Sequence, residues 1–134
     1  DGQDTMMGGA GNDTLYGRAP VGEDDATTDF LNGNGGDDHL ILGQGDHGHG
    51  GEGADIFELS SRLTEGTEAQ IGDFNQSEDQ IIISVDGQPL QDNVVTIEID
   101  TSSGQASVLL NGIPIAHVAN ASGLTADMIT LVSR

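Results

Sequence analysis

Aspartate residues recur at regular intervals in a glycine-rich first half of the chain. Residues 8–16 and 50–58 both follow the pattern G-G-x-G-x-D-x-hydrophobic-x, and residues 33–41 are a looser copy. Glycines let the chain turn at positive φ with little steric cost, so backbone carbonyls can face a common ion. Carboxylate and carbonyl oxygens in a flexible turn favour Ca²⁺ over Mg²⁺ or transition metals. The spacing therefore predicts calcium-binding turns.

The sixth position of each repeat supplies the candidate carboxylate, and neighbouring residues supply further oxygens. The position nine residues after Asp38 is His47, so the repeat around residues 42–49 is interpreted as degenerate, with histidine replacing the carboxylate. Residues 18–28 are polar and contain Pro20, which indicates a loop inserted between repeats. The candidate metal ligands are Asp4, Gly9, Gly11, Asn12, Asp13, Asp29, Gly36, Asp37, Asp38, Gly43, Gly45, Asp46, Gly51, Gly53 and Asp55.

The last three residues of each repeat predict a short strand whose central apolar side chain points inward. The inward residues would be Met6, Leu15, Leu31, Leu40 and Phe57. Beyond residue 60, β-branched residues predict strands at residues 69–74, 80–85, 93–99, 106–110 and 113–118. Asp86-Gly87 and Asn111-Gly112 are hairpin turn signals, and residues 124–129 are compatible with one helical turn with Thr125 as its N-cap.

These repeats resemble those of RTX proteins, the hemolysin-type calcium-binding family. Residues 69–83 and 121–132 are similar to segments that follow the repeats in such proteins. The resemblance implies an all-β fold in which a parallel β-roll over residues 1–59 is followed by a small, mainly antiparallel β cap over residues 60–134. A cap of this kind would cover the open strand edge at the end of a solenoid.

The resemblance also implies where the ions would lie. Two nonapeptides make one turn of the roll, and each ion lies between a turn and the turn two repeats on. This pairs Asp13 with Asp38 and Asp38 with Asp55, and it pairs Asp4 with Asp29 if the inserted loop bulges out. It also pairs Asp29 with His47, which is a poor Ca²⁺ ligand. We expect about three to four Ca²⁺ ions. For Asp73 and Asp79 the alternatives are calcium binding and hydrogen bonding to the backbone of their own turn, and the latter is favoured.

Composition limits the partners of this chain. The 134 residues carry 23 acidic and three basic side chains, a net charge of −20, and no cysteine. Such a polyanion does not attract nucleic acid or an anionic membrane, and no long apolar run predicts membrane insertion. Self-repulsion predicts an unfolded chain without calcium and a folded chain with it. The family implies secretion by type I export machinery into a calcium-rich extracellular medium, as a part of a larger polypeptide.

Three classes of function are consistent with these features. The first is a calcium-dependent folding module that supports export and extracellular stability. The second is an enzyme, but H-E-x-x-H and G-x-S-x-G motifs are missing, so any catalytic domain is expected N-terminal to Asp1. The third is an adhesion or polysaccharide-binding module with a glycan partner. His39, His47 and His49 could in principle hold a transition metal, but exposed histidines in a turn are the favoured interpretation.

Overall fold

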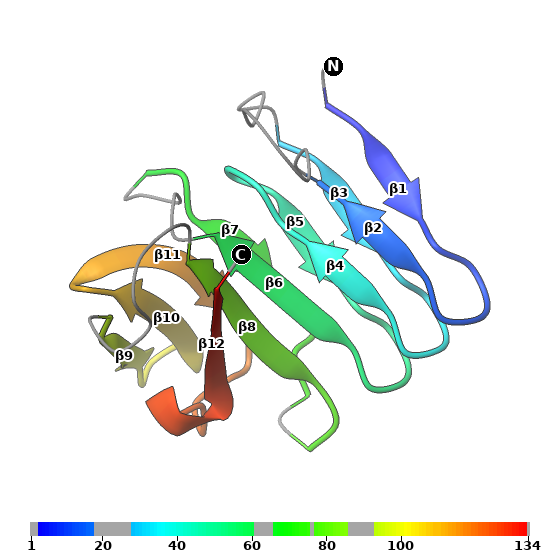
Figure 1. The fold of residues 1–134 in the computed structure, drawn as a ribbon. Helices are drawn as coiled ribbons and strands as arrows, with labels where there is room; N and C mark the ends of the chain where they lie inside the picture. Colours follow the sequence, from blue (N-terminus) through cyan, green and yellow to red (C-terminus); the bar gives the residue numbers. More distant parts are fainter. Residues whose placement is uncertain (1–2, 18–27, 61–65, 76, 86–92, 134) are drawn as a thin grey trace.

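The computed structural model describes residues 3–17, 28–60, 66–75, 77–85 and 93–133, whose regular secondary structure is almost entirely β-strand (Figure 1). Among the described residues there is also a short 3₁₀ helix, η2, which spans Ala126–Met128. None of the helical structure in the described ranges is long and apolar enough to cross a membrane. The strands are β1 (Thr5–Met7), β2 (Thr14–Tyr16), β3 (Phe30–Asn32), β4 (His39–Ile41), β5 (His47–His49), β6 (Ile56–Ser60), β7 (Ala69–Ile71), β8 (Gln80–Val85), β9 (Val95–Asp100), β10 (Gln105–Leu110), β11 (Ile113–Val118) and β12 (Ile129–Ser133).

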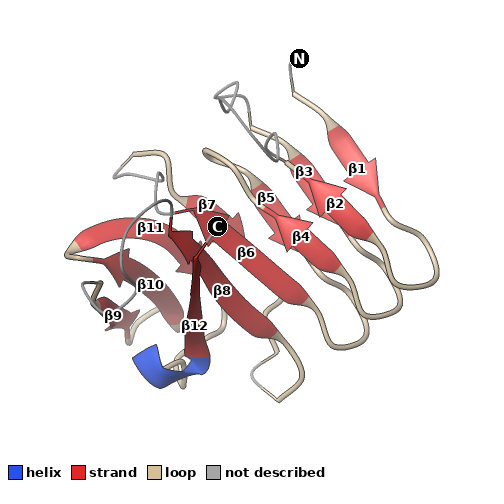
Figure 2. Cartoon of the chain, viewed as in Figure 1, coloured by secondary structure: helices blue, strands red, loops and turns tan. Residues whose placement is uncertain are grey.

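From β1 to β8, successive strands alternate between two sheets, as the parallel β-roll requires. One sheet has the order β1-β3-β5-β7-β11-β10-β9 and the other has the order β12-β8-β6-β4-β2. From β1 to β8 every pair within a sheet is parallel, and Figure 2 shows the resulting stack of short strands joined by turns at both margins. Two strands and two turns therefore form one coil of the roll.

The hydrophobic core lies between the two sheets. The strands β1 to β4 each direct their central side chain inward, because side chains alternate between the faces of a strand. Leu31, Leu40 and Phe57 are fully buried, while Met6 and Leu15 near the open end are partly buried against the same cluster. The five inward positions expected from the repeat are thus confirmed.

The parallel roll continues beyond residue 59. The strands that follow the expected boundary, β7 and β8, still pair in parallel with β5 and β6. Antiparallel pairing begins with β9, β10 and β11, which extend the first sheet because β11 lies parallel to β7. The last strand, β12, is again parallel, to β8. The region after residue 59 is therefore part roll and part antiparallel meander.

Local signals in the second half locate its elements well. The strands expected at residues 80–85 and 113–118 have those bounds, and β9 and β10 differ from expectation by one or two residues. The strand expected at 69–74 ends at Ile71. Asn111-Gly112 forms the tight turn between β10 and β11, with positive φ at both residues. Thr125 is the N-cap of η2, although its side chain makes no capping hydrogen bond. Asp86-Gly87 and loop residues 18–27 lie outside the described residues.

Candidate metal sites in the turns

Four aspartates are stacked along one margin of the roll. They end the turns that lead into β2, β4, β6 and β8. The backbone N–H of Asp13 donates to Oδ1 of Asp38 at 2.8 Å, and that of Asp38 donates to Oδ1 of Asp55 at 2.9 Å. The N–H of Asp55 in turn donates to Oδ1 of Asp79 at 2.9 Å. The carboxylates of Asp38, Asp55 and Asp79 are therefore each fixed against the preceding turn, and the expected juxtapositions of Asp13 with Asp38 and of Asp38 with Asp55 are confirmed.

A second, shorter stack lies along the opposite margin. The N–H of Asp4 donates to Oδ1 of Asp29 at 2.8 Å, so these two aspartates are aligned even though the inserted loop lies between them in sequence. The N–H of Asp29 donates to Oδ1 of Asp46, also at 2.8 Å. Oδ2 of Asp46 accepts the N–H of Gly43 at 2.7 Å. Both oxygens of this fully buried carboxylate are therefore engaged by backbone.

The expected pairing of Asp29 with His47 is wrong. Asp46 takes the carboxylate position because the interval from Asp38 to Asp46 is eight residues, one fewer than in a full repeat. The shortened turn closes at Gly45, whose φ is +74°. His47 is instead the first residue of β5, and its ring lies against that of Phe30 on β3, with centroids 4.8 Å apart. This repeat therefore keeps its carboxylate.

Three carboxylate oxygens in the first stack are buried without a hydrogen-bond partner: Oδ2 of Asp13, Asp38 and Asp55. A buried unpaired polar atom is costly, and a charged one is more so, unless an ion satisfies it. The first glycine of each turn leaves the space these oxygens face. A Cβ at Gly8 would lie 2.7 Å from Oδ2 of Asp13 and 2.9 Å from the carbonyl oxygen of Gly33. Carboxylate and carbonyl oxygens thus converge there, a donor set that suits Ca²⁺.

The middle of each turn adds further oxygens between consecutive coils. The turns are in register, since Ala10 bridges to Gly35 and Gly35 bridges to Glu52. Gly36, at φ +114°, lies against the carbonyl of Gly11, and a Cβ there would be 3.1 Å from Oδ1 of Asn12. The same relation recurs one coil on for Gly36, Asp37 and Gly53, and positive φ also occurs at Gly9 and Gly51. These predicted ligands are therefore brought together by the stacking of the turns.

Asn12 and Asp37 are already used by backbone groups. Oδ1 of Asn12 accepts the N–H of Asp37 at 2.8 Å, and Oδ1 of Asp37 accepts the N–H of Ala54 at 2.8 Å. Their first role is therefore to tie one coil to the next.

Asp73 and Asp79 end the array. Asp79 accepts the N–H of Asn75 in its own turn at 2.8 Å through Oδ2, in addition to the N–H of Asp55. Asp73 accepts the N–H of Gly50 at 2.8 Å and the N–H of Gly51 at 2.7 Å. All four oxygens thus bind backbone, which is the structural role favoured for these residues. Asp73 bonds the preceding turn, however, and not its own.

The first stack concentrates negative charge in a buried place. Burial raises the pKa of Asp55 from 3.8 to about 6, and the carboxylates of Asp79, Asp38 and Asp73 add to the rise against an opposing backbone hydrogen bond. Burial likewise raises the pKa of Asp79. A cation in these turns would offset both effects, because it favours the ionised carboxylate.

Side chains alone do not build a metal site here. Across the described ranges, no three His, Asp or Glu side chains converge to hold an ion. His39 lies on β4, where its Nε2 is 3.1 Å from Oε1 of Glu58, while His47 and His49 lie on β5 in the other sheet. An ion in the turns would therefore take most of its ligands from backbone carbonyls. Sequence reasoning did not single out Gly8, Gly33 and Gly50, although the first glycine of the repeat marks them.

Comparison with known proteins agrees with the geometry of the turns. Residues 1–19 and 24–46 match the RTX calcium-binding nonapeptide repeat (4 copies). No curated protein matches the chain. Among solved structures, the chain is similar to the AlgE6R3 subunit from the Azotobacter vinelandii mannuronan C5-epimerase, with a TM-score of 0.67 and 22% identity over 96% of this chain and 78% of that one. It is also similar to the AlgE6R2 subunit of the same enzyme, with a TM-score of 0.54 and 21% identity over 96% and 92% of the two chains.

The fold and the repeats together define the class of this protein. It is a parallel β-roll module, and its N-terminal coils are built from RTX calcium-binding nonapeptide repeats. The resemblance to RTX proteins drawn from the nonapeptides is confirmed, as is the expected fold class.

Proposed function

We propose that this chain is a calcium-dependent folding module that supports the export and extracellular stability of a larger secreted protein. The observation that carries the proposal is the row of three buried, unpartnered carboxylate oxygens facing backbone carbonyls in successive turns. Without a cation, each of these oxygens opposes folding. With Ca²⁺, each becomes a ligand and ties two coils together.

The overall charge of the chain also makes folding depend on calcium. A chain with net charge −20 repels itself when compact, and each Ca²⁺ ion offsets two of these charges. Because a formed site exists only in the folded chain, the free energy of binding adds to the free energy of folding. Low cytosolic calcium would leave the chain unfolded and ready for a type I exporter. The extracellular medium would then fold it, since sites of extracellular modules bind Ca²⁺ with Kd on the order of 10⁻⁴ to 10⁻³ M.

The orphaned oxygens suggest three ions along the first stack, one each at Asp13, Asp38 and Asp55. This agrees with the lower end of the number expected from the repeat. In the second stack the Asp46 carboxylate is already satisfied by backbone, which favours weaker binding there.

The test is far-UV circular dichroism during a Ca²⁺ titration, with Mg²⁺ as control and native mass spectrometry to count ions. The expected result is a transition from coil to β structure with Ca²⁺ only, with about three ions bound at its end point. A spectrum already rich in β structure in EGTA and unchanged by Ca²⁺ would overturn the proposal.

Export is tested separately, by fusing the chain to a type I secretion signal in bacterial cells. Replacing Asp13, Asp38 and Asp55 together by Asn should leave translocation intact but make the secreted chain sensitive to protease in millimolar calcium. Equal protease resistance of the wild-type and substituted chains would contradict a role in extracellular stability. We assign no catalysis to this module, so incubation with mannuronan should leave the polymer unchanged.

A further inference from the structure

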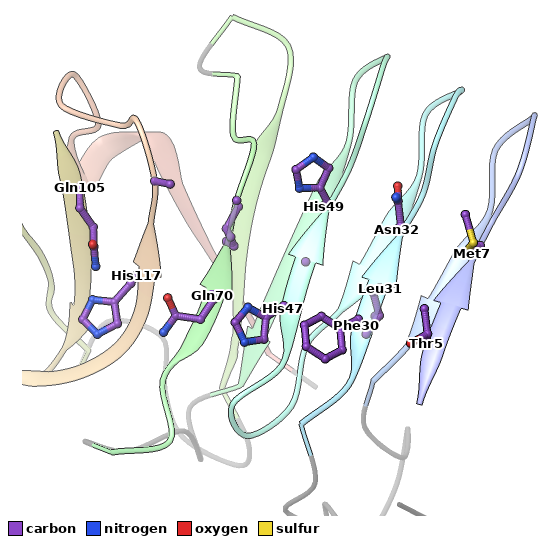
Figure 3. Close-up of a pocket in the computed structure, with 14 residues that line it drawn as sticks. Thr5, Met7, Phe30, Leu31, Asn32, His47, His49, Gln70, Gln105 and His117 are labelled. Atoms are coloured by element: carbon purple, nitrogen blue, oxygen red, sulfur yellow. The ribbon is translucent and has the colours of Figure 1, made fainter. Parts of the chain in front are cut away.

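A groove of about 450 Å³ runs across the outer face of the seven-stranded sheet, away from the turns (Figure 3). One cross-strand row lies along it, because the register aligns Thr5 with Phe30, Phe30 with His47, His47 with Gln70, and Gln70 with His117. A second row brings Met7, Asn32 and His49 alongside. The volume is that of a small-molecule or oligosaccharide site.

The rings of the groove offer a flat apolar surface. Phe30 is 41% exposed on the sheet face, and the planes of its ring and that of His47 are within 14° of each other, with centroids 4.8 Å apart. Figure 3 shows the two rings side by side on neighbouring strands. Exposed aromatic faces stack readily on flat apolar ligand surfaces.

Polar groups beside the rings can both donate hydrogen bonds to a ligand and accept hydrogen bonds from it. Gln70 and Gln105 line the groove, and within the described part of the chain their side-chain amides have no hydrogen-bond partner. An amide both donates and accepts, as does a neutral imidazole, which matches the properties of a hydroxyl group.

The charges around the groove exclude a polyanion. Among the residues that the structure describes, no Lys, Arg, Asp or Glu lines it, although the chain as a whole is strongly acidic. At its margins, Oδ2 of Asp73 lies 3.6 Å from Nε2 of His49, and Oε1 of Glu68 lies 4.0 Å from Nε2 of His117, so within the described ranges the groove is bordered by carboxylates. An acidic glycan or a nucleic acid would be repelled, and the floor provides no carboxylate to hold a cation.

We propose that this groove binds an uncharged chain of pyranose sugars laid across the strands. Neighbouring strands are about 4.8 Å apart, so the row from β1 to β11 presents one side chain about every 4.8 Å. A linear ligand whose repeating unit has a similar length would meet one side chain per unit. The carbon–hydrogen face of one sugar would lie on Phe30, and its hydroxyls would bond to Gln70 and His47. This site is separate from the turns, and it depends on the proposed function only in that calcium must fold the roll.

The test is isothermal titration of the full, calcium-saturated chain with three neutral hexasaccharides: cellohexaose, mannohexaose and xylohexaose. We expect at least one to bind. Phe30→Ala should weaken that binding by about tenfold or more, as for an aromatic residue central to an interface. Tyr16→Ala is the matched control, because Tyr16 is 47% exposed on the outer edge of the other sheet, and it should not change the affinity. Gln70→Ala should also weaken binding.

Several results would overturn this inference. They are no binding of any of the three sugars, equal binding by the Phe30 variant, or an equal loss in the Tyr16 control. Tighter binding of polymannuronate than of the neutral sugars would indicate an ionic site. A dimer in sedimentation velocity that is lost on Phe30→Ala would indicate that a second copy of the chain covers the groove. Circular dichroism of each variant in Ca²⁺ is measured before the sugar titrations. A variant that does not fold in Ca²⁺ tests the proposed folding function, whereas a variant that folds but does not bind sugar tests this groove.

Discussion

The carboxylate of Asp55 is expected to make folding in the absence of calcium depend on pH. Its side chain is buried between Asp38 and Asp79, and its folded-state pKa is about 6 against 3.8 for the ordinary group. Because the pKa is raised on folding, the stability contributed by the protonated group is fully present below pH 3.8 and is lost as the pH rises through about 6.

The size of this effect follows from the two pKa values. At roughly 1.4 kcal/mol per pKa unit, ionisation of Asp55 costs the folded, calcium-free chain about 3 kcal/mol at neutral pH. About half of that cost arises between pH 5 and pH 7.5, which corresponds to roughly a tenfold change in the folding equilibrium constant. Asp55→Asn removes the ionisation but retains an acceptor oxygen for the N–H of Asp38.

The assay is circular dichroism in EGTA at pH 5 and pH 7.5, with trimethylamine N-oxide added to bring the folding equilibrium into range. Wild type should gain stability on acidification, and Asp55→Asn should gain about 1.4 kcal/mol less. In calcium, Asp55→Asn should disfavour folding, because the variant loses a Ca²⁺ ligand. Its Ca²⁺ midpoint should rise about 10- to 100-fold. Glu98→Gln, on an exposed position of β9, is the control. An identical pH dependence in the wild type and the Asp55 variant would refute the reasoning.

Three further substitutions probe other parts of the structure. Gly33→Ala should raise the Ca²⁺ midpoint and destabilise the chain by about 1–3 kcal/mol, because its Cβ would meet a carbonyl oxygen of the next turn at 2.8 Å. Gly35→Ala is the control and should leave both quantities unchanged, because its Cβ would meet nothing within 4 Å. Equal Ca²⁺ midpoints for the two variants would contradict the oxygen-lined site. Leu40→Ala should lower the free energy of unfolding by about 2–5 kcal/mol, measured by urea at saturating Ca²⁺, because Leu40 is fully buried in the core. Val94→Ala, at an exposed position, is the control and should change this free energy little. A small loss of stability in the Leu40 variant would mean that the roll is loosely packed. Asp73→Asn leaves one of two backbone N–H groups without its acceptor, so the free energy of unfolding should fall by about 1–2 kcal/mol. Native mass spectrometry should show the same number of bound ions as in the wild type. Loss of an ion would instead show that Asp73 is a Ca²⁺ ligand.

The nonapeptide period was sufficient to predict the coil of the roll. Glycine at fixed offsets allows the turn, one apolar residue per short strand defines the inner face, and an aspartate ends each turn. These are local requirements of a repeating structure, so Leu31, Leu40 and Phe57 could be assigned to the core before any fold was known. Equivalent positions in successive coils must then stack, which is why Asp13, Asp38 and Asp55 could be expected in one row.

The tertiary structure decided what depends on neighbouring coils. Counting nine residues placed His47 in the carboxylate position, but the hydrogen bond from Asp29 selects Asp46, because a one-residue deletion is absorbed in the turn and strand pairing is preserved. The two oxygens of Asp73 reach backbone N–H groups more than 20 residues earlier in the chain. Likewise, the sheet register, and not local sequence, brings Phe30, His47 and Gln70 into one groove. A repeat specifies its own turn and inward residue, whereas contacts across coils are fixed only when the strands pair.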